Sequence, residues 1–203
     1  MVNLRLTLKV VDIDSVDKLT SLKNLRDWGF NHMDFIEYGP GWSDVAVRRR
    51  FPQNRVGVRT ANRNSFLQAG GTPFYRDKTV SEAIEIGKSI WNDWRVIIYD
   101  WSEAGGAVVS GHMVIGEGYG LYEIFYGPGI VRDVDKRADV IRARFTYPSQ
   151  IYDTNVRLVA EKSALLSELA GIGDIVVEFS VFNRPTGLLA EHAIFWEYRQ
   201  YLD

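Results

Sequence analysis

The chain has 203 residues, and its hydrophobic fraction of 46% is enough for one sizeable domain or two small ones. The formal net charge of −2 gives no basic surface, so nucleic acid is not expected as the main partner. The absence of cysteine excludes disulfides and thiolate metal sites. No run approaches the roughly 18 apolar residues of a membrane helix, and the N-terminal sequence lacks a signal-peptide pattern. We therefore expect a cytoplasmic protein that does not bind membranes.

The first half of the chain is predicted to alternate short strands with two helices. Apolar and polar residues alternate over 4–11, as in a strand, and Asp14 and Ser15 offer a cap for the helix that follows. In that helix, apolar residues recur at three-residue steps up to Trp28, and Gly29 ends it. Strands are predicted at 32–38, 55–59 and 96–99, a basic segment at 45–51, and a second helix at 80–91.

The second half of the chain is predicted to be mainly antiparallel sheet. From Gly106 onward, three strands follow one another with short turns, which is typical of a meander. A long helix is then predicted at 155–169, ending at Gly171. The last two predicted strands are 174–182 and 192–201.

This order of elements predicts an α+β fold. We expect two interleaved lobes with antiparallel sheets and flanking helices. The pattern of predicted helices and strands has a modest break at residues 92–93. We place the boundary there, between an N-terminal lobe, 1–93, and a C-terminal lobe, 94–203. The first lobe would carry a lysine on its helix, an arginine on a strand and a glycine-rich loop, and the second lobe the one long helix.

One stretch, VGVRTANRNSFLQAGGTPFY at 56–75, carries residues suited to an anion. Arg59 stands at the end of an apolar run and is followed by small polar residues and the pair Gly70 and Gly71. Arginine donates two parallel hydrogen bonds to a phosphate, and glycine lets backbone N–H groups approach one. The stretch therefore indicates a phosphate site, although Arg59 could also pair with a carboxylate and the glycines could form an ordinary turn.

Several short motifs follow one another in an order that resembles a known family. In chain order they are Lys18, Leu22 and Gly29 on the first helix, VRTANR with Arg59, SFLQAGG, TPFY, SEAIEIGKSIW, VIIYDW, YEIFYGPG with Glu123, VVEFSV with Glu178, and FWEYR with Glu197 and Arg199. This order is similar to that of the ATP-binding domain of pyruvate phosphate dikinase and phosphoenolpyruvate synthase, a variant of the ATP-grasp fold. The resemblance spans nearly the whole chain, which is much shorter than that domain.

The resemblance implies an ATP site in which Mg²⁺ lies between phosphates and carboxylates. It implies that Arg59 and Arg199 contact the phosphates and act in catalysis, and that Glu178 and Glu197 bind Mg²⁺. The residues implied to bind the rest of ATP are Lys18, Gly70, Gly71, Tyr99, Trp101 and Glu123. Because the sequence has 203 residues, we do not expect it to hold the family's phosphohistidine and pyruvate domains as well. The phosphate acceptor is therefore expected on a separate protein or small molecule.

The sequence departs from the family's pattern at the strand that binds the metal. The family carries two acids separated by one residue, but Val176 stands at the first of these positions, and Asp174 lies two residues further upstream. Glu197 replaces the family's glutamine, and this could restore a carboxylate to the metal site or repel the phosphates. Ile130 replaces a further acid.

Three functions therefore stay open. The first is Mg-ATP-dependent phosphoryl transfer, and the second is a degenerate, non-catalytic binding or regulatory module, which Val176 favours. The third is an unrelated α+β protein whose aromatic surface binds a partner chain. His32, His112 and His192 lack a phosphocarrier motif and are expected to be ordinary histidines, and Lys18 could be a solvated helix lysine.

Overall fold

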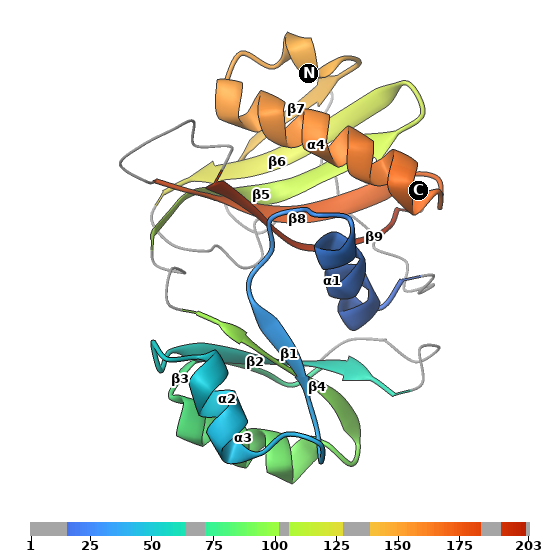
Figure 1. Ribbon diagram of the computed structural model, residues 1–203. Coiled ribbons are helices and arrows are strands. Elements are labelled where there is room, and N and C mark those ends of the chain that lie inside the picture. The colour runs from blue at the N-terminus through green and yellow to red at the C-terminus, as the bar shows by residue number, and fades with distance from the viewer. Residues whose placement is uncertain (1–15, 64–71, 102–105, 128–138, 184–191, 202–203) are drawn as a thin grey trace. The chain divides into compact units, whose positions relative to one another are not determined.

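The computed structural model describes residues 16–63, 72–101, 106–127, 139–183 and 192–201. In these ranges the chain forms two compact units, one within Val16–Gly105 and one within Gly106–Asp203. Each unit has its own antiparallel sheet with helices beside it (Figure 1). The strand predicted at 4–11 lies outside the described residues. The first helix begins later than predicted, because its cap is Asp17 and not Asp14 or Ser15.

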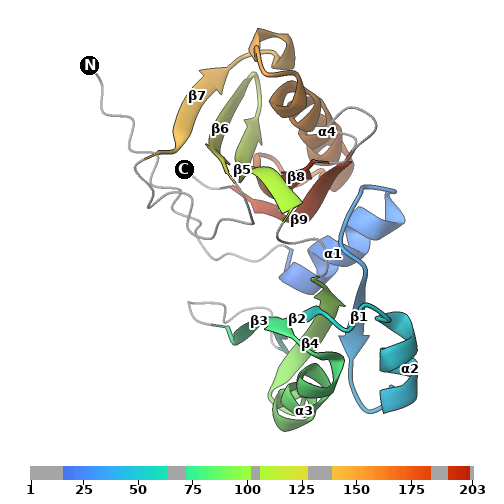
Figure 2. The same cartoon turned by 90° about the vertical axis from the view of Figure 1, so that its left-hand side faces the viewer.

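The first unit is built on a four-stranded sheet in the order β1-β4-β2-β3. Its elements are α1 (Lys18–Asp27), β1 (Phe35–Tyr38), α2 (Asp44–Arg50), β2 (Val56–Asn62), β3 (Phe74–Lys78), α3 (Val80–Ile90) and β4 (Trp94–Asp100). Helices α2 and α3 pack on one face, where Val58, Ile84 and Ile98 are buried in a shared apolar cluster. Helix α1 lies on the other side of this sheet (Figure 2).

Local sequence explains where these helices begin. The carboxylate of Asp17 caps α1 by accepting hydrogen bonds from two N–H groups of the first turn, both at 2.8 Å. Thr79 and Glu82 form a reciprocal capping box at the start of α3. Ser43 caps α2, so the segment 45–51, which the sequence marked only as basic, is largely helical.

The division between the units differs from the predicted boundary between residues 93 and 94. Strand β4 begins at Trp94 and pairs with β1 on one side and with β2 on the other. It is therefore a central strand of the first sheet, and the chain divides instead between Gly105 and Gly106. The break seen at 92–93 is the turn that joins α3 to β4.

The second unit is built on a five-stranded sheet in the order β7-β6-β5-β8-β9. Its elements are β5 (Ala107–Gly116), β6 (Tyr119–Tyr126), β7 (Ile141–Phe145), the short 3-10 helix η3 (Pro148–Gln150), α4 (Thr154–Ala170), β8 (Ile175–Phe182) and β9 (Ala193–Gln200). Met113, Val177 and Tyr198 face one another across the three strands β5, β8 and β9 and are almost fully buried. Helix α4 packs against β5 and β8. It ends at Gly171, as predicted, in the left-handed conformation with φ of 61°.

The arrangement is the α+β fold with antiparallel sheets and flanking helices that the sequence predicted. Within the described ranges, none of the helices is both long and apolar enough to cross a membrane.

Candidate functional site

A row of charged and polar residues crosses one face of the five-stranded sheet. Arg142 of β7 lies opposite Glu123 of β6, and Glu123 lies opposite His112 of β5. His112 also lies opposite Glu178 of β8, which in turn lies opposite Glu197 of β9. Residues directly opposite one another on neighbouring strands share a face of the sheet. The five side chains therefore leave the same face, and we refer to them as the charged row.

Two carboxylates of the charged row are deeply buried, since Glu123 and Glu197 are each only 2% exposed. Oε1 of Glu123 accepts a hydrogen bond of 2.7 Å from Nε of Arg142. Oε1 of Glu197 lies 2.8 Å from Nη2 of Arg199, two residues along the same strand. A buried carboxylate is stable only with such a partner, because transfer of a lone charge out of water is costly. Both acids are therefore held in the sheet as ion pairs.

The charged row includes buried polar atoms that lack a hydrogen bond. Among the described residues, Oε2 of Glu123 and Nδ1 of His112 are buried and have no hydrogen-bond partner. Buried polar atoms of this kind are uncommon in native proteins, and they call for an explanation such as a bound water, ion or ligand. The two residues are direct neighbours on β5 and β6. This part of the face is therefore suited to a bound polar group.

The two predicted metal ligands, Glu178 and Glu197, lie directly opposite each other on β8 and β9. In the part of the chain that the structure describes, no three His, Asp or Glu side chains gather into a group that could hold a metal ion. Mg²⁺ is usually held by one or two carboxylates together with waters and substrate phosphates. The donor set therefore fits Mg²⁺ bound together with a phosphate, and it does not fit a metal held by the protein alone.

The residues beside Glu178 show why the strand carries no second acid. Val176 is 5% exposed and packs in a small apolar cluster that includes Val114. Asp174 lies just before the strand and accepts a hydrogen bond of 2.6 Å from the hydroxyl of Tyr119. Asp174 therefore anchors the start of β6, and Val176 is a core residue.

A second cluster lies on the face of the four-stranded sheet that α2 and α3 leave uncovered. The guanidinium of Arg59 lies 5.4 Å from the centre of the Phe74 ring. That of Arg76 lies 5.0 Å from the same ring and 5.7 Å from the ring of Trp101. The rings of Tyr99 and Trp101 meet edge to face at 5.8 Å. We call these five residues the arginine–aromatic cluster. It contains three of the predicted site residues and two, Phe74 and Arg76, that the sequence analysis missed.

Glycine at position 57 is required by this cluster. Gly57 lies opposite Tyr99 on the neighbouring strand, and a Cβ there would lie 2.3 Å from Cζ of the tyrosine. The ring of Tyr99 therefore lies across the glycine, where no other residue would leave it room.

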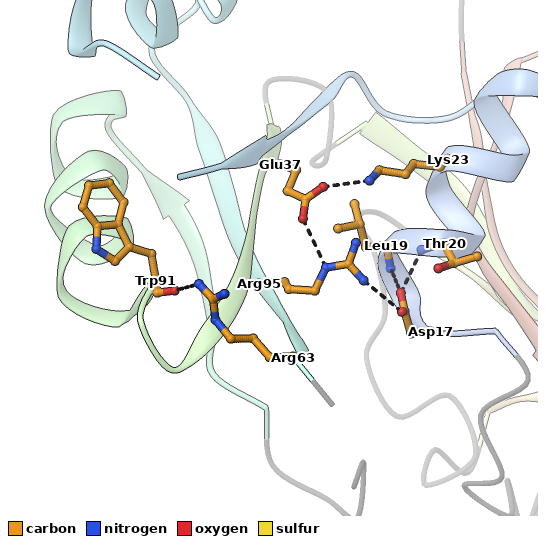
Figure 3. A network of polar contacts seen from close by, with 8 residues as sticks. All are labelled: Asp17, Leu19, Thr20, Lys23, Glu37, Arg63, Trp91 and Arg95. Atoms are coloured by element: carbon orange, nitrogen blue, oxygen red, sulfur yellow. Dashed lines mark hydrogen bonds and ion pairs between the residues drawn. The ribbon is translucent and has the colours of Figure 1, made fainter. Parts of the chain in front are cut away.

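Helix α1 is tied to the first sheet by a chain of four charges (Figure 3). Oδ2 of Asp17 lies 3.1 Å from Nη1 of Arg95, and Nε of Arg95 lies 3.1 Å from Oε1 of Glu37. The other oxygen of Glu37 lies 2.7 Å from Nζ of Lys23. Lys18 is the first residue of α1 and follows the cap directly. The chain of charges therefore fixes the end of the helix from which Lys18 projects.

Three residues named in the sequence analysis, Gly70, Gly71 and Ile130, lie outside the described residues. His112 was interpreted as an ordinary histidine, yet it lies at the centre of the charged row. The two-residue turn between β5 and β6 contained the missing signal, because counting outward from such a turn pairs His112 with Glu123.

Comparison with known proteins shows similarity in structure only. The sequence matches no protein-family model and no curated protein. The D-alanine–D-alanine ligase of Coxiella burnetii matches with a TM-score of 0.59 at 12% identity, over 90% of this chain and 47% of that one. The D-alanine–D-alanine ligase of Bacillus anthracis, complexed with ATP, matches with a TM-score of 0.52 at 17% identity, over 91% of this chain and 54% of that one. The N5-carboxyaminoimidazole synthetase of Staphylococcus aureus, complexed with ADP, matches with a TM-score of 0.53 at 15% identity, over 92% of this chain and 45% of that one.

These matches define the class of fold. The chain has an α+β, ATP-grasp-like fold with two antiparallel sheets and flanking helices, as the resemblance implied. It spans about half the length of the proteins that it matches.

Proposed function

We propose that the chain is a cytoplasmic, ATP-grasp-like domain that binds Mg-ATP for phosphoryl transfer, and that it is related to the ATP-binding domain of phosphoenolpyruvate synthase. The charged row is the observation that carries the proposal. It places two facing carboxylates, Glu178 and Glu197, on the same sheet face as the unsatisfied buried atoms of Glu123 and His112. The fold supports the proposal, since matched proteins of the same fold are complexed with ATP and ADP.

In the charged row, Glu178 and Glu197 would hold Mg²⁺. The metal supplies charge neutralisation to the phosphates and orients the group that is transferred. Two facing carboxylates repel each other and a triphosphate unless a cation lies with them. Arg199, beside Glu197, would donate to a phosphate oxygen. Glu123 would accept a hydrogen bond from the nucleotide through its unsatisfied oxygen.

In the arginine–aromatic cluster, Arg59 would bind a phosphate with its planar fork. Its guanidinium already rests against Phe74, so little side-chain freedom is lost when it binds. Tyr99 and Trp101 would offer ring surface to the adenine. Lys18 would add positive charge from the start of α1, and the backbone at residues 70–71 would cradle the phosphates.

A binding module without catalysis is the second candidate. Val176 supports it, because a buried apolar residue stands where the resembling family has an acid. With one acid fewer, the site would bind Mg-ATP and transfer the phosphoryl group slowly or not at all. Measured release of ADP, with and without candidate acceptor molecules, distinguishes the two functions.

Calorimetric titration of the chain with ATP, in the presence and absence of Mg²⁺, tests the proposal. We expect binding that Mg²⁺ strengthens, and saturating Mg-ATP at a hundred times its Kd should add about 2.7 kcal/mol of stability. Glu178→Gln keeps the shape of the side chain but removes its charge. The gain in affinity that Mg²⁺ gives should fall by about tenfold or more in this variant. Binding of ATP without metal should not be weakened, because the variant removes a charge that repels the phosphates.

The matched control is Glu161→Gln, which removes an exposed carboxylate from α4. This variant should bind Mg-ATP like the wild type. The proposal is wrong if no nucleotide binds to the wild-type chain. Glu178 is not a metal ligand if its variant responds to Mg²⁺ as the control does.

A further inference from the structure

A pocket of about 410 Å³ lies in the first unit and is separate from both clusters described above. Its lining combines aromatic and charged side chains. The residues that carry the argument are the aromatic Phe35 and Trp42 and the charged Lys23, Arg26, Arg50 and Glu37. They come from α1, from the edge strand β1 and from the segment that leads into and through α2. None of the residues proposed to bind Mg-ATP lines this pocket.

The lining of the pocket carries more cations than acids. Its lining contains three cations and one acid, Glu37, and that acid already faces both Lys23 and Arg95. The negative charge of Glu37 is therefore neutralised from inside the first unit. Arg26 and Arg50 remain as planar forks, a geometry that suits a carboxylate or a phosphate.

The two arginines are held in place in a way that leaves them available to a ligand. Arg26 lies 2.9 Å from Asp27 and rests 5.8 Å from the centre of the Phe35 ring. Arg50 pairs with Asp34. Neither aspartate lines the pocket, and both arginine side chains are 51% exposed. Exposed pairs of this kind contribute about 1 kcal/mol or less, so an anion in the pocket can share the guanidinium groups at little cost.

The apolar part of the lining limits what the anion can be attached to. Phe35 and Ile36 are buried and Trp42 is half-buried, so part of the lining is apolar. A pocket of this volume is in the range of small-molecule sites, whose walls are mainly apolar with a few polar groups that fix orientation. A bare inorganic ion would leave these apolar side chains exposed to water.

We propose that this pocket binds a small molecule that combines a flat apolar ring with one carboxylate or phosphate group. The ring contacts the aromatic side chains of the lining, Phe35 and Trp42, and the anionic group is bound by Arg26 and Arg50. The site is distinct from the one proposed for Mg-ATP, so it would take an effector or a second substrate.

Calorimetric titrations of the full chain with benzoate, phenyl phosphate and neutral benzyl alcohol test this proposal. At least one of the anions should bind at least tenfold more tightly than benzyl alcohol, and the anion that does so identifies the preferred group. Arg26→Gln and Arg50→Gln should each weaken that binding about tenfold, the effect of one lost charge-assisted hydrogen bond. Because the exposed ion pairs of these arginines contribute about 1 kcal/mol or less, the thermal unfolding midpoint should fall by no more than about 4 °C.

Arg49→Gln is the matched control, since Arg49 is the exposed neighbour of Arg50 on α2 and does not line the pocket. This variant should bind the probe like the wild type. Absence of binding by both anions, or equal binding by the Arg49 and Arg50 variants, overturns the proposal. Binding of Mg-ATP should be the same in all these variants, so a failure here is distinguishable from a failure of the proposed function.

Discussion

Glu123 is a single residue in which structural and proposed functional roles meet. One carboxylate oxygen is held by Arg142 and the other is buried without a partner among the described residues. The ion pair with Arg142 explains how a charge is kept inside the sheet. The other oxygen is left as an acceptor for a ligand. A substitution at the partner separates the two roles, because it leaves the acid itself in place.

Arg142→Met should therefore destabilise the fold. It keeps the apolar stem and removes the charge that faces Glu123, which leaves a buried carboxylate uncompensated. We expect a loss of about 1–3 kcal/mol in the free energy of unfolding, measured with urea. Arg144→Met, on the same strand but exposed and resting on the ring of Tyr119, is the control. Equal effects of the two substitutions would contradict the role of the Glu123 pair.

Glu37 makes the stability of the first unit depend on pH. Burial alone would raise the pKa of Glu37, but hydrogen bonds and charges from Lys23 and Arg95 outweigh burial and hold that pKa below the ordinary value of 4.5. At pH values above 4.5 the ionised carboxylate of Glu37 therefore stabilises the folded state. This stabilisation is lost as the pH falls through the lowered pKa.

Glu37→Gln should cost up to about 1 kcal/mol at neutral pH, since its partners are partly exposed. The difference from wild type should shrink as the pH of the unfolding experiment falls below 4.5. Glu85→Gln, on the exposed side of α3, should show neither the loss nor its pH dependence. A difference at Glu37 that is constant from neutral to acid pH would show that the ionised carboxylate does not stabilise the fold.

At the scale of elements, the charged row depends on how closely β5 and β6 approach. Gly111 lies on β5 next to His112, and a Cβ there would lie 2.2 Å from the backbone oxygen of Glu123. A backbone oxygen cannot rotate away as a side chain can, so the two strands would have to separate. The glycine therefore sets the distance between the two strands.

Gly111→Ala should destabilise the second unit by about 1–3 kcal/mol in chemical unfolding, the usual effect of overpacking. Gly106→Ala is the control, because its Cβ would meet only the ring of Phe182 at 3.9 Å, an ordinary contact. If the two alanines are tolerated equally, the close approach of β5 and β6 does not determine this part of the sheet.

Local signals in the sequence predicted most elements and little of their pairing. The helix predicted at 80–91 and the helix predicted to end at Gly171 are confirmed by the structure nearly to the residue. The pairing of His112 with Glu123 follows from a two-residue turn, but that of Glu178 with Glu197 does not. A register shift follows Glu178, and a strand irregularity of this kind leaves no pattern in a single sequence.

At the scale of the whole molecule, the order of motifs predicted the class of fold, and the structural matches confirm an ATP-grasp-like fold. The boundary between the units could not be predicted in the same way. Strand β4 joins β1 and β2 through pairings distant in sequence, whereas the break before it is only a local turn. The finer relation to phosphoenolpyruvate synthase stays a proposal that depends on what the charged row binds.

The most direct measurement is an NMR titration of the isotopically labelled chain with Mg-ATP. The account predicts that backbone amide signals of Glu178, Glu197 and Arg199 shift together as one nucleotide is bound, and that the signals of Arg59 and Tyr99 shift over the same range of concentration. Amide signals across both groups that stay in place at saturating Mg-ATP would contradict it.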